Sequence, residues 1–368
     1  MINKKSISLA SLLLLVLFML LTSTAAPVRA NAPAASSPVP ILAYYYIWFD
    51  SKSWDRAKVD YPLLGRYSSD DRTVMLQHIR QAKAAGITGF IVSWKRTDVL
   101  NRRLDQLVDL AEQENFKLAI IYQGLDFNRD PLPADRIASD LDFFVQRYAG
   151  RAAFKLFAKP MVIWSGTWKF TPQEISLVST GRRGSLLLLA SERNLDGYNR
   201  LAGLVDGNAY YWSSVNPDTF SGYEDKLVGM SKAVHQNGGL WIPPAAPGFD
   251  ARLIGGTSVV DRKNGDTFRT QINTAMASSP DALGIISWNE FSENSHIEPS
   301  VIYGSRYLDI LSEVNHLSAP PIAEFDSSEP AAAFPEVFPG SRMAALGGLA
   351  AIIITGLIVI VRRNIYAG

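Results

Sequence analysis

The sequence contains no cysteine among its 368 residues. Disulfide bonds are therefore excluded, and the stability of the folded chain must come from its hydrophobic core. With 47% apolar and 19% charged residues, the chain is long enough and apolar enough to bury the core of one large globular domain.

The sequence also lacks an excess of charge of either sign. Its formal net charge is +1, and its lysines and arginines are scattered rather than gathered into a stripe. This distribution excludes the electrostatic footprint of a nucleic-acid-binding protein. Aromatic residues are plentiful instead. The 8 tryptophans and 14 tyrosines exceed what a core requires, and their flat amphipathic rings suit stacking against sugars.

Metal-binding patterns are absent as well. His296 has no second histidine at the spacing of a zinc site. Asp126, Asn128 and Asp130 are spaced like half of a calcium loop, but Pro131 stands where the turn glycine belongs and no downstream glutamate completes the loop. We therefore predict no metal and no other cofactor.

Residues 1–30 have the form of a secretory signal peptide. Lys4 and Lys5 precede an apolar stretch over residues 9–21, and small residues then lead to Val-Arg-Ala at residues 28–30, which resembles a cleavage site. We therefore expect the chain to be secreted.

The C-terminal end predicts an anchor. Residues 343–361 form an uncharged run just long enough to span a bilayer of roughly 30 Å, and Arg362 and Arg363 follow it directly. Residues 319–340 are rich in proline and acidic residues, which predicts an extended stalk. Residues 341–368 thus form either a transmembrane anchor or a sorting tail that is cleaved. In both cases we expect a domain tethered to the membrane or the cell surface, on the outside.

Residues 31–318 are predicted to form one domain in which short apolar strands alternate with amphipathic helices. Apolar residues at helical spacing predict helices over residues 104–111 and 137–145, and a capping box at residues 171–174 predicts the start of another. The strands are predicted over residues 41–48, 88–94, 117–123, 160–165, 186–191, 205–212, 240–243 and 283–288.

Eight strands with intervening helices match an α/β fold of the (β/α)8 TIM-barrel type in number and size. A doubly wound open sheet is the structural alternative. Such a sheet more often carries a glycine-rich phosphate loop after its first strand, and this sequence has none there. We therefore predict the barrel.

The carboxyl ends of barrel strands are where active sites lie. Aromatic and polar residues gather at these positions, with Tyr46 and Trp48 at the end of the first strand, Trp94 at the end of the second, Gln123 at the end of the third and Tyr211 at the end of the sixth. Aromatic walls with a few polar groups are typical of carbohydrate sites. We therefore predict a cleft that binds a polysaccharide or an oligosaccharide.

The most informative segment follows the eighth strand. Residues 287–299 read Ser-Trp-Asn-Glu-Phe-Ser-Glu-Asn-Ser-His-Ile-Glu-Pro, which places three carboxylates, an amide and aromatic rings where a buried strand leaves the core. Ionisable groups at such a position indicate chemistry, and this composition is typical of a sugar-cleaving site.

This segment resembles a motif of glycoside hydrolase family 99, which comprises endo-α-mannosidases, endo-α-mannanases and their relatives. The family pattern Asn-Glu-Trp-x-Glu-Gly-Thr-x-Ile-Glu-Pro is similar to residues 289–299. Residues 247–252 and 262–265 are similar to the family's Pro-Gly-Tyr-Asp and Arg-x-Asn-Gly patterns after strand seven, and residues 45–48 agree too. The resemblance covers nearly the whole predicted barrel.

The resemblance implies a retaining, endo-acting α-glycoside hydrolase, with mannose-containing glycans as the leading substrates. Glu290 matches the base that removes a proton from the 2-hydroxyl of the sugar, so that this oxygen displaces the leaving group and a 1,2-anhydro sugar forms. Glu293 matches the general acid that protonates the leaving oxygen and then activates water. Close carboxylates suit these two roles because their mutual repulsion separates their pKa values.

The remaining candidates each have a functional and a structural interpretation. Arg252 and Arg262 either contact the substrate or tie loops together, and Glu298 either contacts the substrate or is a charge at the start of the following helix. The aromatic residues either line the cleft or pack beneath it. The predicted substrate-binding residues are Tyr46, Trp48, Trp94, Gln123, Tyr211, Arg252, Arg262, Asn289 and Glu298.

The sequence also departs from the family pattern. Gln123-Gly124-Leu125 stands where the family has Glu-Pro-Tyr, which removes a charged contact from the cleft and leaves the substrate open. The segment after strand eight also resembles the Trp-Asn-Asp-x-x-Glu-Ser motif of fungal-type α-1,3-glucanases of family 71. An α-1,3-glucanase, a sugar transferase and a non-catalytic barrel that binds surface polysaccharide are therefore the alternatives.

Overall fold

The computed structural model describes residues 38–126 and 128–315. The predicted signal peptide, stalk and anchor lie outside these residues and stay predictions. Within the described ranges, no helix is both long enough and apolar enough to cross a membrane.

All eight predicted strands are present, and the later ones are shorter than predicted. The seventh is interrupted at Pro243 and continues as a separate short strand. The barrel strands are β1 (Ile41–Tyr46), β2 (Gly89–Trp94), β3 (Lys117–Gln123), β4 (Met161–Ser165), β5 (Leu187–Leu189), β6 (Gly207–Ala209), β7 (Leu240–Ile242), β8 (Pro244–Ala245) and β11 (Leu283–Ile285).

These strands form a ring of parallel pairs. One sheet has the order β5-β4-β3-β2-β1-β11-β8, and β6 pairs with β7 in a second sheet. A parallel bridge between Ala190 and Asn208 joins the end of β5 to β6, and β8 directly follows β7 along the chain. The predicted (β/α)8-like architecture is therefore confirmed.

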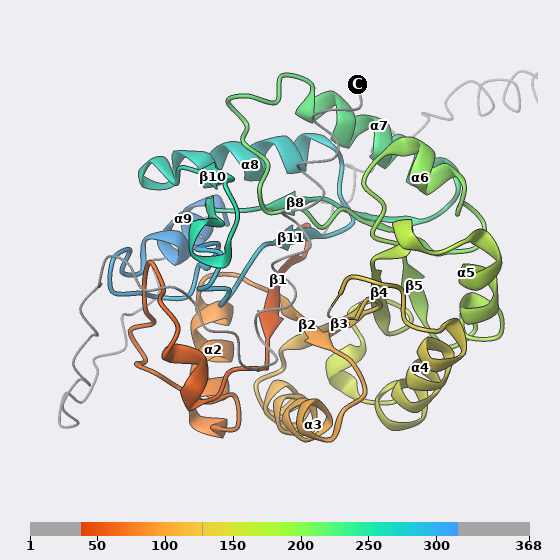
Figure 1. Ribbon diagram of the computed structural model, residues 1–368, viewed down its shortest axis with the longest axis horizontal. Helices are drawn as coiled ribbons and strands as arrows, with labels where there is room; N and C mark the ends of the chain where they lie inside the picture. Colours follow the sequence, from red (N-terminus) through yellow and green to blue (C-terminus); the bar gives the residue numbers. More distant parts are fainter. Residues whose placement is uncertain (1–37, 127, 316–368) are drawn as a thin grey trace, which may run out of the picture. The chain divides into compact units, whose positions relative to one another are not determined.

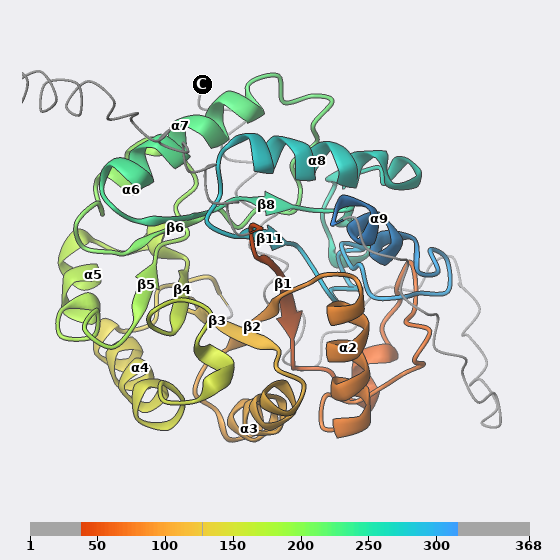
Figure 2. The ribbon, with the colours of Figure 1, turned by 180° about the vertical axis from the view of Figure 1, so that it is seen from behind.

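The helices lie around the strands, as the two opposite views in Figures 1 and 2 show. The predicted capping box is present, with the Thr171 hydroxyl accepting a hydrogen bond from the Glu174 amide at 3.2 Å. The α-helices are α2 (Arg72–Ala84), α3 (Asp98–Gln113), α4 (Ala134–Tyr148), α5 (Pro172–Ser179), α6 (Leu195–Asn199), α7 (Tyr223–Gln236), α8 (Asp266–Ala277) and α9 (Arg306–Val314).

Short elements fill several of the connections. A two-stranded antiparallel sheet pairs β9 (Phe249–Asp250) with β10 (Val259–Val260) in the long segment after β8. The 3-10 helices are η1 (Ser51–Trp54), η2 (Ala152–Phe154), η3 (Thr167–Lys169), η4 (Arg252–Ile254) and η5 (Lys263–Gly265).

Alternation along the strands divides the buried residues into two layers. Leu42 and Tyr44 of β1 pack inside the ring with Ile91 of β2, whereas Ala43 and Tyr45 pack between the strands and the helices. Successive side chains of a strand point to opposite faces, so the position of each residue along its strand decides which layer it joins. The same rule decides which residues at the strand ends face the centre of the barrel.

The pair β6 and β7 allows no side chain at Gly207. This residue has a φ of +148°, and a Cβ atom added there would lie 2.1 Å from the carbonyl oxygen of Leu240. Only glycine accepts this backbone conformation and this close approach without strain.

We expect Gly207→Ala to lower the free energy of unfolding by about 1–3 kcal/mol, because the strands must separate to admit the methyl group. The control is Gly229→Ala in α7, where an added Cβ meets no atom within 4 Å and alanine favours the helix by up to about 1 kcal/mol. Denaturant unfolding of both variants measures the difference. A Gly207→Ala protein as stable as the wild type would contradict this account of the strand pair.

Candidate active site

The segment of residues 287–298, here named the strand-eight loop, closes on itself directly after β11. The Ser287 amide donates to the Ser295 carbonyl at 2.8 Å, and the Ile297 amide donates to the Ser287 carbonyl at 2.9 Å. The Trp288 amide donates to the carbonyl of Tyr44 in β1, also at 2.8 Å. These bonds hold residues 290–294 as a compact turn at the carboxyl end of the barrel.

Glu290 lies at the start of this turn and is 3% exposed. One of its carboxylate oxygens accepts a hydrogen bond from the Ser292 amide at 3.1 Å. Burial raises the pKa of Glu290 to about 7, and the positive charge of Lys58 acts in the opposite direction. The carboxyl group therefore exchanges its proton near neutral pH.

Glu293 is also 3% exposed, and the Ser213 hydroxyl donates to its carboxylate at 3.4 Å. The carbonyl of Glu293 accepts from the Asp250 amide at 2.7 Å, which fixes the backbone to β9. Burial, together with the negative charge of Glu290, raises the pKa of Glu293 to about 8, while Arg129 acts in the opposite direction.

The neighbouring charges act differently on the two carboxyl groups. Lys58 favours the ionised form of Glu290, whereas the negative charge of Glu290 favours the protonated form of Glu293. Two buried carboxyl groups whose surroundings favour different protonation states therefore stand three residues apart on one turn.

Three predicted aromatic residues lie at this site. The hydroxyls of Tyr46 and Tyr211 are hydrogen-bonded to each other, and the ring of Trp48 packs 4.4 Å from the ring of Tyr46. Burial raises the pKa of Tyr46 and of Tyr211 well above the usual range, and the charges of Glu290 and Glu293 raise both further. Both phenols therefore remain protonated hydrogen-bond donors beside the carboxylates.

Asn289 is fully buried and joins the strand-eight loop to β1. Its side-chain oxygen accepts from the Tyr46 amide at 2.9 Å, and its side-chain nitrogen donates to the Tyr46 carbonyl at 3.0 Å and to the Tyr67 hydroxyl at 3.3 Å. Asn289 therefore positions Tyr46 and Glu290 through the backbone.

Glu298 belongs to a buried hydrogen-bonded chain behind the carboxylates. It accepts from the Tyr67 hydroxyl at 2.9 Å and lies 3.0 Å from Nε2 of His78. Nδ1 of His78 lies 3.0 Å from the Tyr45 hydroxyl. With Nε2–H donating to Glu298, Nδ1 accepts from Tyr45. These contacts give Glu298 a supporting position, different from both predicted ones.

The structure separates Trp94 from the other predicted residues. Its position along β2 directs the indole outward, where it is fully buried against Phe143 and Phe144 of α4 and donates to Asn101 at 3.1 Å. Gln123, at the end of β3, lies on the inner face and donates to the Ser93 hydroxyl at 2.8 Å. Of these two residues, Gln123 alone faces the centre of the barrel.

The two predicted arginines occupy different environments. Arg252 is exposed and pairs with Asp250, whereas Arg262 is buried and donates to the carbonyls of Asn294 and His296 at 2.9 Å. The guanidinium of Arg262 also lies 4.2 Å from the centre of the Tyr303 ring. Arg262 therefore fastens the strand-eight loop, which agrees with its structural interpretation.

His296 supports the same loop. Its ring stacks on Phe291 with 3.9 Å between centroids, and its Nε2 lies 3.3 Å from the Asp60 carboxylate. Burial and the charge of Arg262 lower the pKa of His296 to about 4, so the imidazole is neutral at neutral pH.

Three groups next to the carboxylates have no signal in the sequence. Lys58 comes from the segment between η1 and α2, Arg129 from the segment between β3 and α4, and Ser213 from the segment after β6. They lie far apart along the chain and form no motif with residues 287–298. Only the closed barrel brings them together.

Comparisons with known proteins agree on one family. The model of "Glycosyl hydrolase family 99" matches residues 49–317. A mouse glycoprotein endo-α-1,2-mannosidase-like protein is 24% identical over 345 residues, covering 76% of this chain and 75% of the relative. The rat glycoprotein endo-α-1,2-mannosidase is 22% identical over 266 residues, covering 66% of this chain and 56% of the relative.

A solved structure shows the same fold. The GH99 endo-α-mannosidase from Bacteroides thetaiotaomicron superimposes with a TM-score of 0.67 at 20% identity, and the match covers 75% of this chain and 96% of that one. The segment that carries the strand-eight loop lies within the matched family model.

The raised pKa of Glu293 predicts that this residue lowers stability at high pH. The folded state holds the Glu293 proton up to about pH 8, whereas the unfolded chain releases it near the ordinary glutamate pKa of 4.5, so the free energy of unfolding falls as the pH rises between these values. Glu293→Gln removes this loss. We expect the variant to gain about 2 kcal/mol or more relative to the wild type between pH 5 and pH 9.

Thermal or denaturant unfolding at both pH values measures this gain. Glu224→Gln changes an exposed carboxylate of α7 in the same way and serves as the control. A difference between Glu293→Gln and the wild type that does not change with pH would contradict the burial of a carboxylate at this position.

Proposed function

This chain belongs to glycosyl hydrolase family 99 and is a glycoside hydrolase, and on that premise we propose that it cleaves internal bonds of α-mannan-like glycans with Glu290 and Glu293 as its catalytic pair. The observation that carries the proposal is the pair of buried carboxyl groups on the strand-eight loop, where Lys58 favours the ionised form of Glu290 and Glu290 favours the protonated form of Glu293. The names of the relatives support α-mannosidic bonds as the first substrates to test.

In the first step, the ionised Glu290 removes the proton of the 2-hydroxyl of the sugar. The freed oxygen attacks C1, the bond between C1 and the leaving oxygen breaks, and Glu293 gives its proton to that oxygen. A 1,2-anhydro sugar forms, Glu290 is protonated and Glu293 is ionised. The lower pKa of Glu290 and the higher pKa of Glu293 support this order of proton transfer.

In the second step, Glu293 removes a proton from water, and the hydroxyl attacks C1. The three-membered ring opens, and the 2-oxygen takes back the proton from Glu290. C1 is inverted twice, so the product retains the original configuration. Because the sugar supplies its own nucleophile, the separation of the two carboxylates does not decide the stereochemical outcome as it does in the usual two-carboxylate scheme.

The groups around the pair fit these roles. The positive charge of Lys58 favours the ionised form of Glu290, which is the form that acts as a base. The phenols of Tyr46 and Tyr211 remain protonated beside both carboxylates. One of them donates to the other, which leaves one O–H to donate to an oxygen where charge develops.

We expect Glu290→Gln and Glu293→Gln each to lower turnover by about 100-fold or more, because each removes a group that transfers a proton in the transition state. The measurement is the release of oligosaccharides from a panel of α-mannans and α-glucans. Glu224→Gln serves as the control on the same panel. Wild-type turnover by either variant would refute the catalytic assignment, and products from α-1,3-glucan alone would favour the glucanase alternative.

We also propose that the domain is secreted and tethered outside the membrane through residues 341–368. The apolar run at residues 343–361 and the two arginines after it support this proposal. Full-length protein, expressed with its own N-terminal segment, is expected in the membrane or envelope fraction and open to added protease. A chain ending at residue 340 is expected in the medium. Recovery of the full chain in the cytoplasmic fraction contradicts the proposal.

A further inference from the structure

Two arginines at the carboxyl end of the barrel lack the carboxylate partners that most other arginines have. Arg103 pairs with Asp70, Arg147 with Asp105 and Arg200 with Glu192. Among the residues that the structure describes, no carboxylate oxygen lies within 4.0 Å of the guanidinium of Arg129 or Arg193, and neither guanidinium forms a hydrogen bond.

Arg129 lies in the connection between β3 and α4. The Asp126 carboxylate accepts from the amides of Asn128 and Asp130 at 2.8 and 2.9 Å, which holds this turn and leaves Arg129 at its tip with a φ of +68°. The side chain is half-buried and lies close enough to Glu293 and Tyr211 to change their electrostatics. The guanidinium therefore faces the candidate active site.

Arg193 follows β5 and lies on the same side. Its guanidinium is 4.7 Å from the ring centre of Trp168 and 5.6 Å from that of Trp212, and it is half-buried. The neighbouring Glu192 carboxylate is engaged by Arg200 at 2.9 Å. The indole rings thus hold Arg193 in place without neutralising it.

The two arginines repel each other. Burial lowers the pKa of Arg129, and the positive charge of Arg193 lowers it further, whereas Glu293 and Tyr211 act in the opposite direction. Burial and the charge of Arg193 also lower the pKa of Lys226 in α7, whose ammonium group donates to the Tyr210 hydroxyl at 3.0 Å. The charge of Glu192 likewise acts against burial in setting the pKa of Arg193, so each arginine has a carboxyl group nearby but forms no ion pair with it. Half-buried positive charges that lie near one another without a contact ion pair destabilise the folded protein. Such an arrangement is explained by a ligand that supplies the missing negative charge.

The hydrogen-bonding groups indicate the chemistry of that ligand. A guanidinium only donates, and the indole nitrogen of Trp168 is a buried donor with no acceptor among the described residues. A neutral sugar offers hydroxyls that both donate and accept. A phosphate or a carboxylate offers acceptors alone and matches the planar fork of arginine.

Building on the proposed function, we propose that the substrate is an anionic glycan whose phosphate or carboxylate group is bound between Arg129 and Arg193. The neutral amide of Gln123 stands on the same inner face, at a position where a carboxylate would repel an anion. The site thus selects its glycan by charge at a point separate from the bond that is cleaved.

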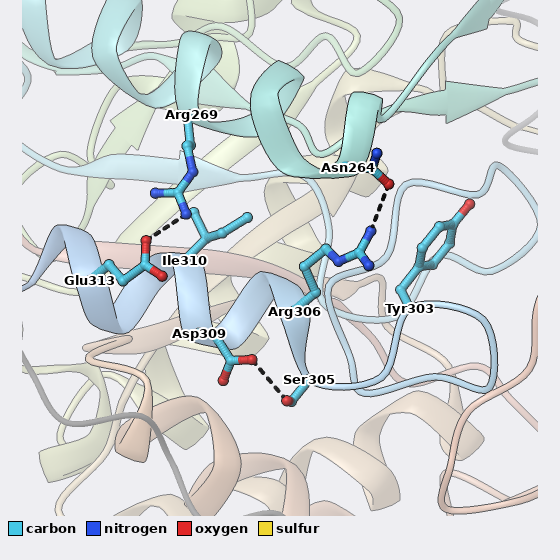
Figure 3. Close-up of a pocket in the computed structure, with 8 residues that line it drawn as sticks. All are labelled: Asn264, Arg269, Tyr303, Ser305, Arg306, Asp309, Ile310 and Glu313. Carbon is cyan, nitrogen blue, oxygen red and sulfur yellow. Dashed lines mark hydrogen bonds and ion pairs between the residues drawn. The ribbon is translucent and has the colours of Figure 1, made fainter.

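A second pocket of the molecule provides a contrast. Figure 3 shows this pocket of about 370 Å³ beside α9, lined by Arg269, Arg306, Asp309 and Glu313. Here Arg269 pairs with Glu313, Arg306 donates to Asn264, and Asp309 accepts from Ser305. The two arginines of this pocket are matched by the two carboxylates of Asp309 and Glu313, so its lining carries no net charge for a ligand to balance.

The test is the binding of matched oligosaccharides to the full-length protein, measured by calorimetry. The probes are a neutral α-mannooligosaccharide, the same molecule carrying a 6-phosphate, and an α-linked oligosaccharide that contains a uronic acid. We expect the wild type to bind one of the anionic probes about 10- to 100-fold more tightly than the neutral probe, as charge-assisted hydrogen bonds predict. The two anionic probes distinguish phosphate from carboxylate.

Arg193→Gln is expected to remove most of this preference, and Arg193→Lys to keep only part of it, because lysine retains the charge but not the fork. Arg96→Gln is the matched control. Arg96 also stacks on an aromatic ring at a strand end, 4.5 Å from the centre of Phe143, but it faces α4. Its substitution should leave the preference unchanged. Thermal unfolding of each variant verifies folding.

Equal binding of neutral and anionic probes by the wild type overturns the inference, as does an anion preference that survives in Arg193→Gln. Turnover of the same three probes is scored separately. If none of them is hydrolysed, the proposed function fails, while the binding comparison still decides whether the arginines select an anion. If the neutral probe is hydrolysed and bound as well as the others, the function stands and the inference fails.

Discussion

The site depends on one link, the pair of hydrogen bonds between the side chain of Asn289 and the backbone of Tyr46. This link joins the strand-eight loop to the end of β1, where the barrel closes. It is fully buried, so no water replaces either partner if the amide is lost. Glu290 follows Asn289 directly, and Tyr46 carries the phenol that bonds to Tyr211. One amide therefore sets the position of the Glu290 carboxylate and of the Tyr46 phenol at the same time.

Burial of the carboxylates, which lowers stability, also produces the chemistry. A carboxyl group in water titrates too low to act as an acid at neutral pH, and desolvation corrects this by disfavouring the charged form. The charges nearby then separate two otherwise similar groups. Lys58 lowers the pKa of Glu290, whereas the negative charge of Glu290 raises the pKa of Glu293 and the positive charge of Arg129 lowers it. The rigid supports behind the loop, including Arg262 and the chain through Glu298, hold these charges close despite their repulsion.

The sequence predicts what depends on periodicity and on contiguous motifs. The strands, the helices around residues 104–111 and 137–145, and the carboxylates of residues 287–298 are all local signals. The structure contains these strands, the later ones shorter than predicted, and these helices, whereas Glu298 takes a supporting position that was not predicted. Trp94 shows where that reasoning stopped short. Side chains alternate along β2, and Ile91 packs inside the ring, so Trp94 three residues later must lie outside it. The alternation of the strand therefore predicts that Trp94 does not line the cleft. Lys58 and Arg129 could not be predicted in this way, because no local sequence pattern distinguishes them. Only the folding of the ring brings their loops close to the carboxylates.

Positive and negative groups occupy different parts of the carboxyl end of the barrel. The carboxylates follow β11, whereas the unpaired arginines follow β3 and β5, three and five places around the ring from it. Opposite charges on one end of a barrel create a field across it, and a ligand with charge at one end and a neutral bond at the other takes a single orientation in that field. An anion drawn to Arg193 is at the same time kept from Glu290. On the proposed function, the carboxylates of the strand-eight loop and the two arginines therefore act together, because each group excludes the wrong end of the substrate.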